Sequence, residues 1–442
     1  MLLSASWLSL GRSAGIPIRQ AEPVPVNLAL FLSNGLFVPV TLPESRRSAS
    51  ALSQQNFLLA AAFIMPLTFS VWQALLNNFV VERAAFTGAE IGMLQSLREV
   101  PGFLAFSAVF VLLIVREQRF ALASLLVMSI GVALTPYFPT TYGLYATTVV
   151  MSLGFHYFET INKSLTLQWI EKGETPHFMG RAMAVKAAGA LLAYSSIWLL
   201  MEWFGVGFEG MYLLAGGAGI LITLTLWAVF PHYPDGAIQH KKLIVRRRYW
   251  LYYALTFLSG ARRQIFMVFA GFMMVEKFGY SAADISLLYL ANYVFNLFFA
   301  PRIGRWVGKV GERRALRVEY IGLVVVFTSY AFVESATVAA GLYIVDHLFF
   351  ALSIAINTYF QKIADPKDIA ATSSVSLTIN HISAVVIPAL LGVFWLTSPP
   401  AVFLVGSGIA LASLIMCGLI PDRPQAGEET RAFPGLAASG RA

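Results

Sequence analysis

The chain contains twelve apolar stretches, each about as long as a helix that crosses a lipid bilayer. A spanning helix needs roughly 20 residues, and only helices or closed barrels can pair all of their backbone groups in lipid. The stretches are continuous and lack the alternation of barrel strands, so they predict an all-α integral membrane protein. Their expected limits are 57–80, 90–114, 119–138, 142–165, 179–202, 210–230, 250–275, 284–306, 314–333, 338–361, 370–396 and 399–420.

The composition is that of a chain dissolved in lipid rather than in water. Only 12% of its 442 residues are charged and 57% are hydrophobic, whereas about 25% of an ordinary globular protein is charged. Too few charged side chains remain to cover a water-facing exterior, which excludes a soluble globular protein. Because Cys417 is the single cysteine, no disulfide framework or thiolate cluster can form, and we expect neither metal nor cofactor.

Lysine and arginine divide unequally between the two sides of the predicted bundle. Seventeen lie in or beside the connections that follow spans 2, 4, 6, 8 and 10, whereas the opposite connections contain only Arg83 and Lys277. The seventeen are Arg116, Arg119, Lys172, Arg181, Lys241, Lys242, Arg246, Arg247, Arg248, Arg302, Arg305, Lys309, Arg313, Arg314, Arg317, Lys362 and Lys367. By the positive-inside rule both termini are cytoplasmic, and we expect a bacterial cytoplasmic (inner) membrane. The net charge of +8 therefore reflects topology, and nucleic acid is not an expected partner.

The twelve spans predict two halves joined by a basic linker. We expect a partly disordered cytoplasmic extension over 1–56, six-helix halves over 57–230 and 250–420, the linker over 231–249, and a disordered cytoplasmic tail over 421–442. The extension has no convincing cleavage site, so a signal peptide is not expected.

The two halves show traces of a common sequence. A shift of 194 residues places Glu82 on Glu276 and Glu90 on Asp284, so that an acidic residue begins spans 2 and 8 at the same distance from a glutamate. Repeated halves are typical of transporter folds.

The connection between spans 8 and 9 carries the most specific motif of the chain. Residues 304–314 read Gly-Arg-Trp-Val-Gly-Lys-Val-Gly-Glu-Arg-Arg. This segment, with the twelve spans and the basic central linker, resembles the major facilitator superfamily, whose loop signature has a Gly, an Asp with a basic residue, a Gly and an Arg pair. The matching residues are Gly304, Lys309, Gly311, Arg313 and Arg314. Gly308 stands where the family has Asp.

The resemblance implies a secondary transporter that binds a small solute near the bilayer midplane and works by alternating access. Such a protein is not an enzyme, and we expect proton-coupled symport by a monomer. The sequence has no Walker loop, zinc-protease motif or nucleophile elbow. Two alternatives remain: a non-transporting scaffold or assembly factor of the same fold, and a lipid flippase or membrane enzyme.

Ionisable residues inside the spans are the candidates for function, because each costs at least about 2.5–3.5 kcal/mol in the bilayer. Those considered for proton coupling or charge pairing are Glu99, Glu159, Lys163, Lys186, His156, His381 and Asp346. Glu159 has two candidate partners, Lys163 one turn along its own helix and Lys186 at similar depth on span 5. Glu99 can pair with Arg98, and the histidines can bond between helices.

Arg262 and Arg263 are the best candidates for binding a solute. Two adjacent guanidinium groups at mid-span remain charged, and no acidic residue lies within one turn on their helix. With Arg98 in the other half, they resemble the arginines that hold the substrate in anion-transporting members of the superfamily. Pairing of the two with Glu99, Asp346 or Glu159 is the alternative. Polar or aromatic residues that suit solute orientation, or hydrogen bonds between helices, are Trp72, Gln73, Asn77 and Asn292.

Overall fold

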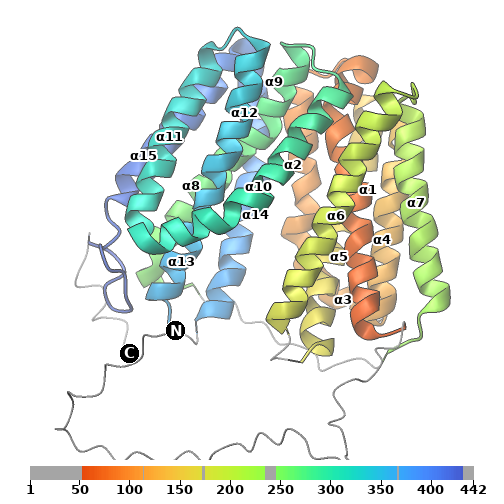
Figure 1. The fold of residues 1–442 in the computed structure, drawn as a ribbon, viewed down its shortest axis with the longest axis horizontal. Helices are drawn as coiled ribbons and strands as arrows, with labels where there is room; N and C mark the ends of the chain where they lie inside the picture. The colour runs from red at the N-terminus through yellow and green to blue at the C-terminus, as the bar shows by residue number, and fades with distance from the viewer. Residues whose placement is uncertain (1–51, 113, 172–174, 234–244, 366–367, 432–442) are drawn as a thin grey trace, which may run out of the picture. The chain divides into compact units, whose positions relative to one another are not determined.

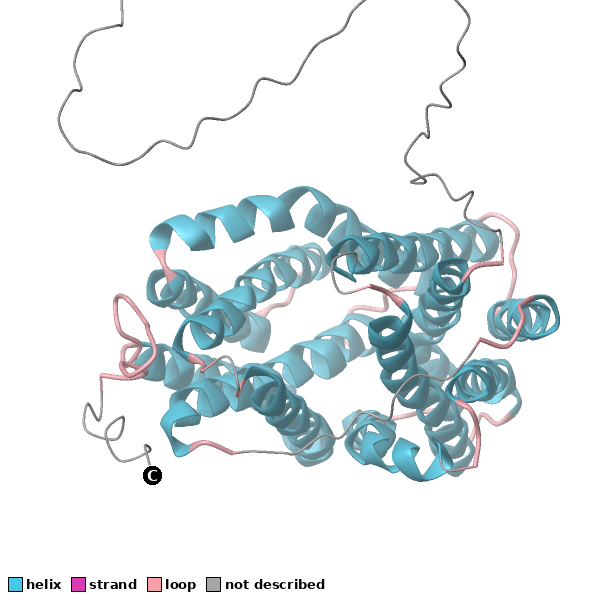
Figure 2. Ribbon diagram, turned by 90° about the horizontal axis from the view of Figure 1, so that it is seen from below, coloured by secondary structure: helices cyan, strands magenta, loops and turns pink. Residues whose placement is uncertain are grey.

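The computed structural model describes residues 52–112, 114–171, 175–233, 245–365 and 368–431, and within these ranges it contains helices and loops but no strand (Figures 1 and 2). The N-terminal half comprises α1 (Gln54–Ala84), α2 (Gly88–Phe103), η1 (Leu104–Ser107), α3 (Ala108–Leu112), α4 (Glu117–Leu134), η2 (Thr135–Tyr137), α5 (Thr141–Trp169), α6 (Thr175–Glu202) and α7 (Phe208–Val229). The C-terminal half comprises η3 (Arg247–Tyr249), α8 (Trp250–Gln264), η4 (Ile265–Ala270), α9 (Gly271–Glu276), α10 (Ala282–Val310), α11 (Glu312–Phe332), α12 (Ala336–Phe350), η5 (Ala351–Ser353), α13 (Ile354–Ile363), α14 (Ile369–Thr397) and α15 (Pro399–Cys417). The extension predicted for 1–56 lies outside the described residues up to residue 51.

Every predicted span coincides with one helix or with consecutive helical segments. Eight helical segments of the described chain are long and apolar enough to cross a membrane. The spans outside this set correspond to α2–α3, α5, α8–α9 and α10. Three of them carry mid-span charges, at Arg98, Glu159 and Arg262, which make these helices less apolar.

Matching capping boxes begin α2 and α10. The Thr87 hydroxyl accepts from the backbone of α2, and the Thr87 backbone N–H donates to the Glu90 carboxylate. Ser281 and Asp284 form the same reciprocal pair at the start of α10. Each box satisfies backbone N–H groups that a helix start leaves unpaired. The residues of the two boxes are 194 positions apart, so the acidic residues that begin spans 2 and 8 have a structural function.

The packing of helices is repeated between the halves. In the N-terminal half α1 packs against α6 and α7, and α4 against α5 and α7; in the C-terminal half α8 packs against α14 and α15, and α11 against α12 and α15. The halves meet where α2 contacts α14 and where α6 contacts α10.

Several contacts between the two halves lie far from the basic connections. We call the end of the bundle that carries Arg116, Arg248 and Arg313 the basic face, and the other end the opposite face. A Cβ on Gly92 of α2 would collide with the Pro388 carbonyl of α14, and one on Gly88 would collide with Trp395. Tyr194 of α6 stacks on Tyr289 of α10 with ring centroids 5.2 Å apart, and the Asn78 amide donates to the Tyr280 carbonyl at 2.6 Å. The halves are therefore packed together toward the opposite face.

Most of the family-like motif lies within helices. Gly304 and Lys309 are in the last turns of α10. Gly311 makes the turn, with φ of +86°, a conformation that favours glycine. Arg313 and Arg314 begin α11.

Arg313 binds the first residues of the predicted tail, which begins at residue 421, to the helical bundle. Its guanidinium pairs with Asp422 at 2.8 Å, and the Arg431 amide donates to the Leu419 carbonyl at 2.9 Å. Tyr359 of α13 donates to the carbonyl of Glu429. Residues 421–431 therefore lie against the basic face, and residues 432–442 are outside the described part.

The end of the basic linker is held at the start of α14 by Asp368. Its carboxylate accepts from Arg248 at 2.7 Å, Arg246 at 3.2 Å and the Tyr249 hydroxyl at 3.1 Å. Burial by itself raises the pKa of Asp368, but the hydrogen bonds from Arg248, Arg246 and Tyr249 outweigh it, and the pKa is lowered from its ordinary value of 3.8.

Replacing Asp368 by Asn should destabilise the protein in a pH-dependent way. At neutral pH we expect a loss of about 1.5 kcal/mol, the lower end for hydrogen bonds to a charged group, because Arg246 is half exposed. Since the folded-state pKa is depressed, this stabilisation is present above pH 4 and is lost as the pH falls through the folded-state value. Thermal unfolding of both proteins at several pH values measures it. The exposed Glu334→Gln is the control, and an equal difference between wild type and D368N at all pH values would contradict the assignment.

Candidate functional site

A polar group at the centre of the bundle joins the two halves. Arg98 of α2 donates through Nη2 to Oε1 of Glu99 at 2.6 Å, and the other oxygen of Glu99 lies 3.2 Å from Nδ1 of His381 on α14. The His156 ring of α5 is 5.3 Å from the His381 ring. Gly102 allows this approach, because a Cβ there would collide with both imidazoles. The structure therefore contains the Arg98–Glu99 pair that the sequence offered as one alternative. The contact between His156 and His381 joins a helix of one half to a helix of the other.

Arg262 is neutralised in the interior of the C-terminal half. Its Nη2 lies 2.7 Å from Oε1 of Glu319 on α11, and the two side chains are 3% and 0% exposed. The Tyr320 ring lies under the guanidinium at 5.1 Å. The carboxyl of Asp346 on α12 is also buried nearby and interacts electrostatically with Arg262. The expectation that Arg262 presents a free charge to a solute is therefore not supported by its position.

Arg263 differs from its neighbour because its side chain is exposed at mid-span. Its guanidinium stacks on the ring of Phe350 at 5.2 Å, and Arg98 and Glu99 are within electrostatic range. Among the described residues, no carboxylate forms an ion pair with it within 4.0 Å. A π-helical turn, Ile265–Ala270, follows directly, and such turns are frequent at functional sites.

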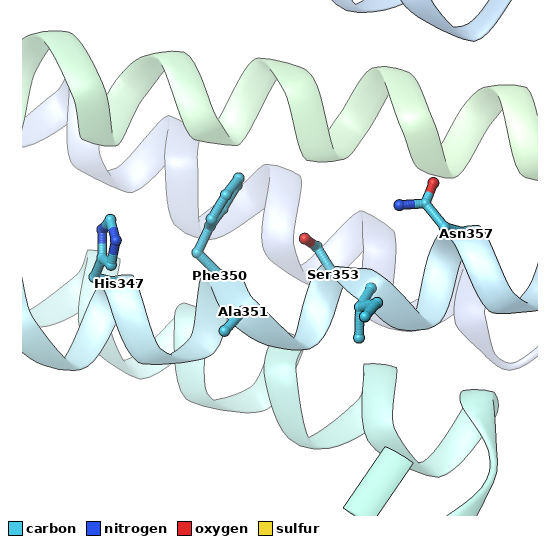
Figure 3. Close-up of a pocket in the computed structure, with 6 residues that line it drawn as sticks. His347, Phe350, Ala351, Ser353 and Asn357 are labelled. Carbon is cyan, nitrogen blue, oxygen red and sulfur yellow. The ribbon is translucent and has the colours of Figure 1, made fainter. Parts of the chain in front are cut away.

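A cavity of about 310 Å³ lies beside Arg263, along the helical segments α12, η5 and α13. Figure 3 shows that four of its lining side chains point to the same side of this segment. They are His347, Phe350, Ser353 and Asn357. The cavity thus combines an aromatic ring, a histidine, a hydroxyl and an amide, and the Arg263 guanidinium stacks on the same aromatic ring.

The charges on α5 and α6 lie closer to the basic face. Glu159 pairs with Lys186 at 3.6 Å, and both side chains are more than one-third exposed. Lys163 is exposed and does not pair with Glu159 within 4.0 Å. Glu159 therefore pairs with Lys186 on the neighbouring helix rather than with Lys163 on its own helix. Because both side chains of the pair are partly exposed, we expect it to contribute little to the stability of the protein.

The polar residues predicted to orient a solute are mostly enclosed by protein. Trp72 is fully buried and stacks near Phe69, Asn77 is 6% exposed, and Gln73 is half-buried. Asn292 of α10 is 2% exposed, and both of its amide atoms lack a hydrogen-bond partner among the described groups. An unpaired buried amide is costly, which makes Asn292 the strongest of the four as a contact for water or solute.

Three contributors to the site were missed in the sequence. Glu319 lies five residues inside span 9, and its charge at membrane depth was the available signal. Phe350 and Ser353 gave no signal, because an aromatic ring or hydroxyl in an apolar span is ordinary.

Comparison with known proteins identifies the family to which this architecture belongs. The family model described as Major Facilitator Superfamily matches residues 57–388 and residues 252–439. The chain belongs to the major facilitator superfamily, and it is a multi-pass membrane protein of the secondary-transporter class with the twelve-helix, two-half architecture of that family. No curated protein shows significant sequence similarity to it.

Solved structures of transporters share the fold. A variant of the nucleoside transporter NupG is 15% identical with a TM-score of 0.69, covering 83% of this chain and 99% of NupG. A POT family transporter in complex with 5-aminolevulinic acid is 13% identical with a TM-score of 0.65, covering 83% and 95%. A bacterial homologue of the human lysosomal transporter Spinster, in an inward-facing and occupied conformation, is 15% identical with a TM-score of 0.59, covering 86% and 96%. At these identities the likeness concerns the fold alone.

The two adjacent arginines should differ in their effect on stability. Arg262→Met leaves Glu319 buried without its cation, which should cost about 3–5 kcal/mol, whereas Arg263→Met removes an exposed group and should cost much less. The double variant R262M/E319L removes both charges and should recover most of the loss. Thermal unfolding of the purified variants measures this. Equal destabilisation by R262M and R263M would contradict the distinction.

Proposed function

We propose that the protein transports a small organic anion by alternating access, with Arg263 as the cation that contacts it. The observation that carries the proposal is the exposed guanidinium of Arg263 beside the cavity. Every other mid-span arginine of the described chain has a carboxylate partner: Arg98 has Glu99 and Arg262 has Glu319. A bidentate guanidinium donor is suited to a carboxylate or phosphate.

The cavity suits a solute of modest size. Its volume of about 310 Å³ is at the lower end for small-molecule sites, which are mostly apolar with few polar contacts. Phe350 supplies an apolar surface, and Ser353 and Asn357 supply hydrogen bonds. The contacts of α2 with α14 and of α6 with α10 toward the opposite face support access from the basic face.

We further propose that the transport is proton-coupled symport. Glu99 and His381 lie 3.2 Å apart across the two halves, so a proton taken up by Glu99 would weaken an interaction that holds the halves together. The positive-inside rule makes the basic face cytoplasmic, with both termini on that side of a bacterial inner membrane. The transporting unit in this proposal is a monomer.

A thermal-shift series tests the anion site. The purified protein is heated with acetate, succinate, citrate or inorganic phosphate, and with uridine and glucose as neutral comparators, since a ligand of the folded state raises the unfolding temperature. Arg263→Gln should weaken binding of the effective anion at least about tenfold, because a charge-assisted hydrogen bond contributes about 1.5–3 kcal/mol.

The matched control is Arg302→Gln, an exposed arginine of α10 near the basic face that donates to the Phe298 carbonyl. It should leave the shift unchanged. A stabilising solute whose affinity is the same in R263Q would refute the role of Arg263, and stabilisation by uridine or glucose alone would refute an anionic solute. The same anion should enter proteoliposomes faster under an inward proton gradient. If none is transported, a scaffold is the better interpretation.

A further inference from the structure

We propose that Glu319 and Asp346 hold one proton between them, so that the C-terminal half contains a proton-binding site separate from the anion site. Arg262 is the cation between α11 and α12, and two carboxyl groups face it. With both carboxyls ionised the group would have a net charge of −1 in the protein interior. One bound proton makes it neutral.

The geometry shows how the three groups are enclosed. Arg262, Glu319 and Asp346 are 2%, 0% and 3% exposed. Each has a polar atom without a hydrogen-bond partner among the described groups: Nη1 of Arg262, Oε2 of Glu319 and Oδ2 of Asp346. A site for a proton is therefore open on both carboxyls.

In the described part of the chain, the surrounding side chains supply no second cation to the two carboxyls. The titratable groups that face the pair from the packed helices are Tyr320 and Tyr330 of α11 and Cys417 of α15, all of which are neutral in their ordinary state. The hydroxyls of both tyrosines are buried without partners among the described groups. Arg313 and Arg317 interact with Cys417 on the side toward the basic face. Among the described residues, neither forms an ion pair with Glu319 or Asp346 within 4.0 Å.

Asp346 is the carboxyl that takes the proton. Glu319 makes the direct 2.7 Å contact with Arg262, which favours its ionised form. Asp346 makes no such contact, and two like charges around one arginine in a low-dielectric interior cannot both be stabilised. Protonation transfers one H⁺ from a hydronium ion of the bulk solvent to the Asp346 carboxylate: an O–H bond forms on Asp346, and the O–H bond of the hydronium breaks and leaves water.

This site lies next to the cavity along the chain. His347 follows Asp346 and lines the cavity, and Arg263 follows Arg262. An anion that binds Arg263 thus changes the electric field at the buried group through adjacent residues on two helices. This coupling rests on the proposed function, whereas the proton itself does not.

Infrared spectroscopy of the full chain in lipid nanodiscs tests the proton directly. A protonated carboxyl has a C=O stretching band that a carboxylate lacks. At neutral pH, Asp346→Asn should lose one such band relative to wild type. Glu319→Gln should lose it too, because Asp346 then ionises as the only partner of Arg262. The control is Glu312→Gln, a buried carboxylate that pairs with Lys362 at 2.7 Å and should leave the band unchanged. A wild-type band that persists in D346N would overturn the proposal.

Thermal unfolding provides a second readout. Each single variant leaves Arg262 with one carboxyl and should unfold near the wild-type temperature, whereas E319Q/D346N leaves it without one and should unfold well below both. Equal unfolding temperatures for the double and single variants would also overturn the proposal. Neither measurement uses a solute. Loss of the band in D346N together with no anion binding at Arg263 would therefore retain the proton site and refute the transport proposal. Anion binding at Arg263 together with a band that persists in D346N would refute the proton site and retain the transport proposal.

Discussion

The cost of an unpaired charge in hydrocarbon governs the interior of this protein. A charge without a partner at membrane depth is expensive, so ionisable groups there are paired or face a polar cavity. Arg98 follows this rule with Glu99, and Arg262 follows it with Glu319. Arg263 follows it differently, because it is exposed beside the cavity. The candidate site is therefore defined by the one described mid-span arginine that is balanced by solvent or solute rather than by a carboxylate.

The same constraint shapes the relation between the halves. Glu99 is bonded within its own helix to Arg98 and across the interface to His381. A movement that separates α2 from α14 must break the second contact and leaves the first intact. The small residues Gly92 and Gly102 bring these helices close enough for the contact to form. Close packing and charge pairing therefore act at the same interface.

The repeated architecture also has a physical basis in particular residues. Thr87 with Glu90 and Ser281 with Asp284 begin equivalent helices, and the same helix pairs pack in each half. The ionisable groups do not follow the repeat. The buried Arg262, Glu319 and Asp346 belong to the C-terminal half, whereas Arg98 and Glu99 belong to the N-terminal half. Two similar scaffolds thus carry different chemistry.

The sequence by itself determined the helices, their order and the basic side of the bundle, because helix length, apolarity and loop charge are local properties. It also identified most of the charges at membrane depth, including both arginines of α8, but not Glu319. Only the tertiary structure decided their partners. Arg262 and Arg263 are adjacent and chemically identical, yet they point in different directions from one helix, so Glu319, 57 positions away along the chain, neutralises one and leaves the other beside the cavity. Partner choice depends on which helices are neighbours, and a single sequence does not contain that information in any local pattern.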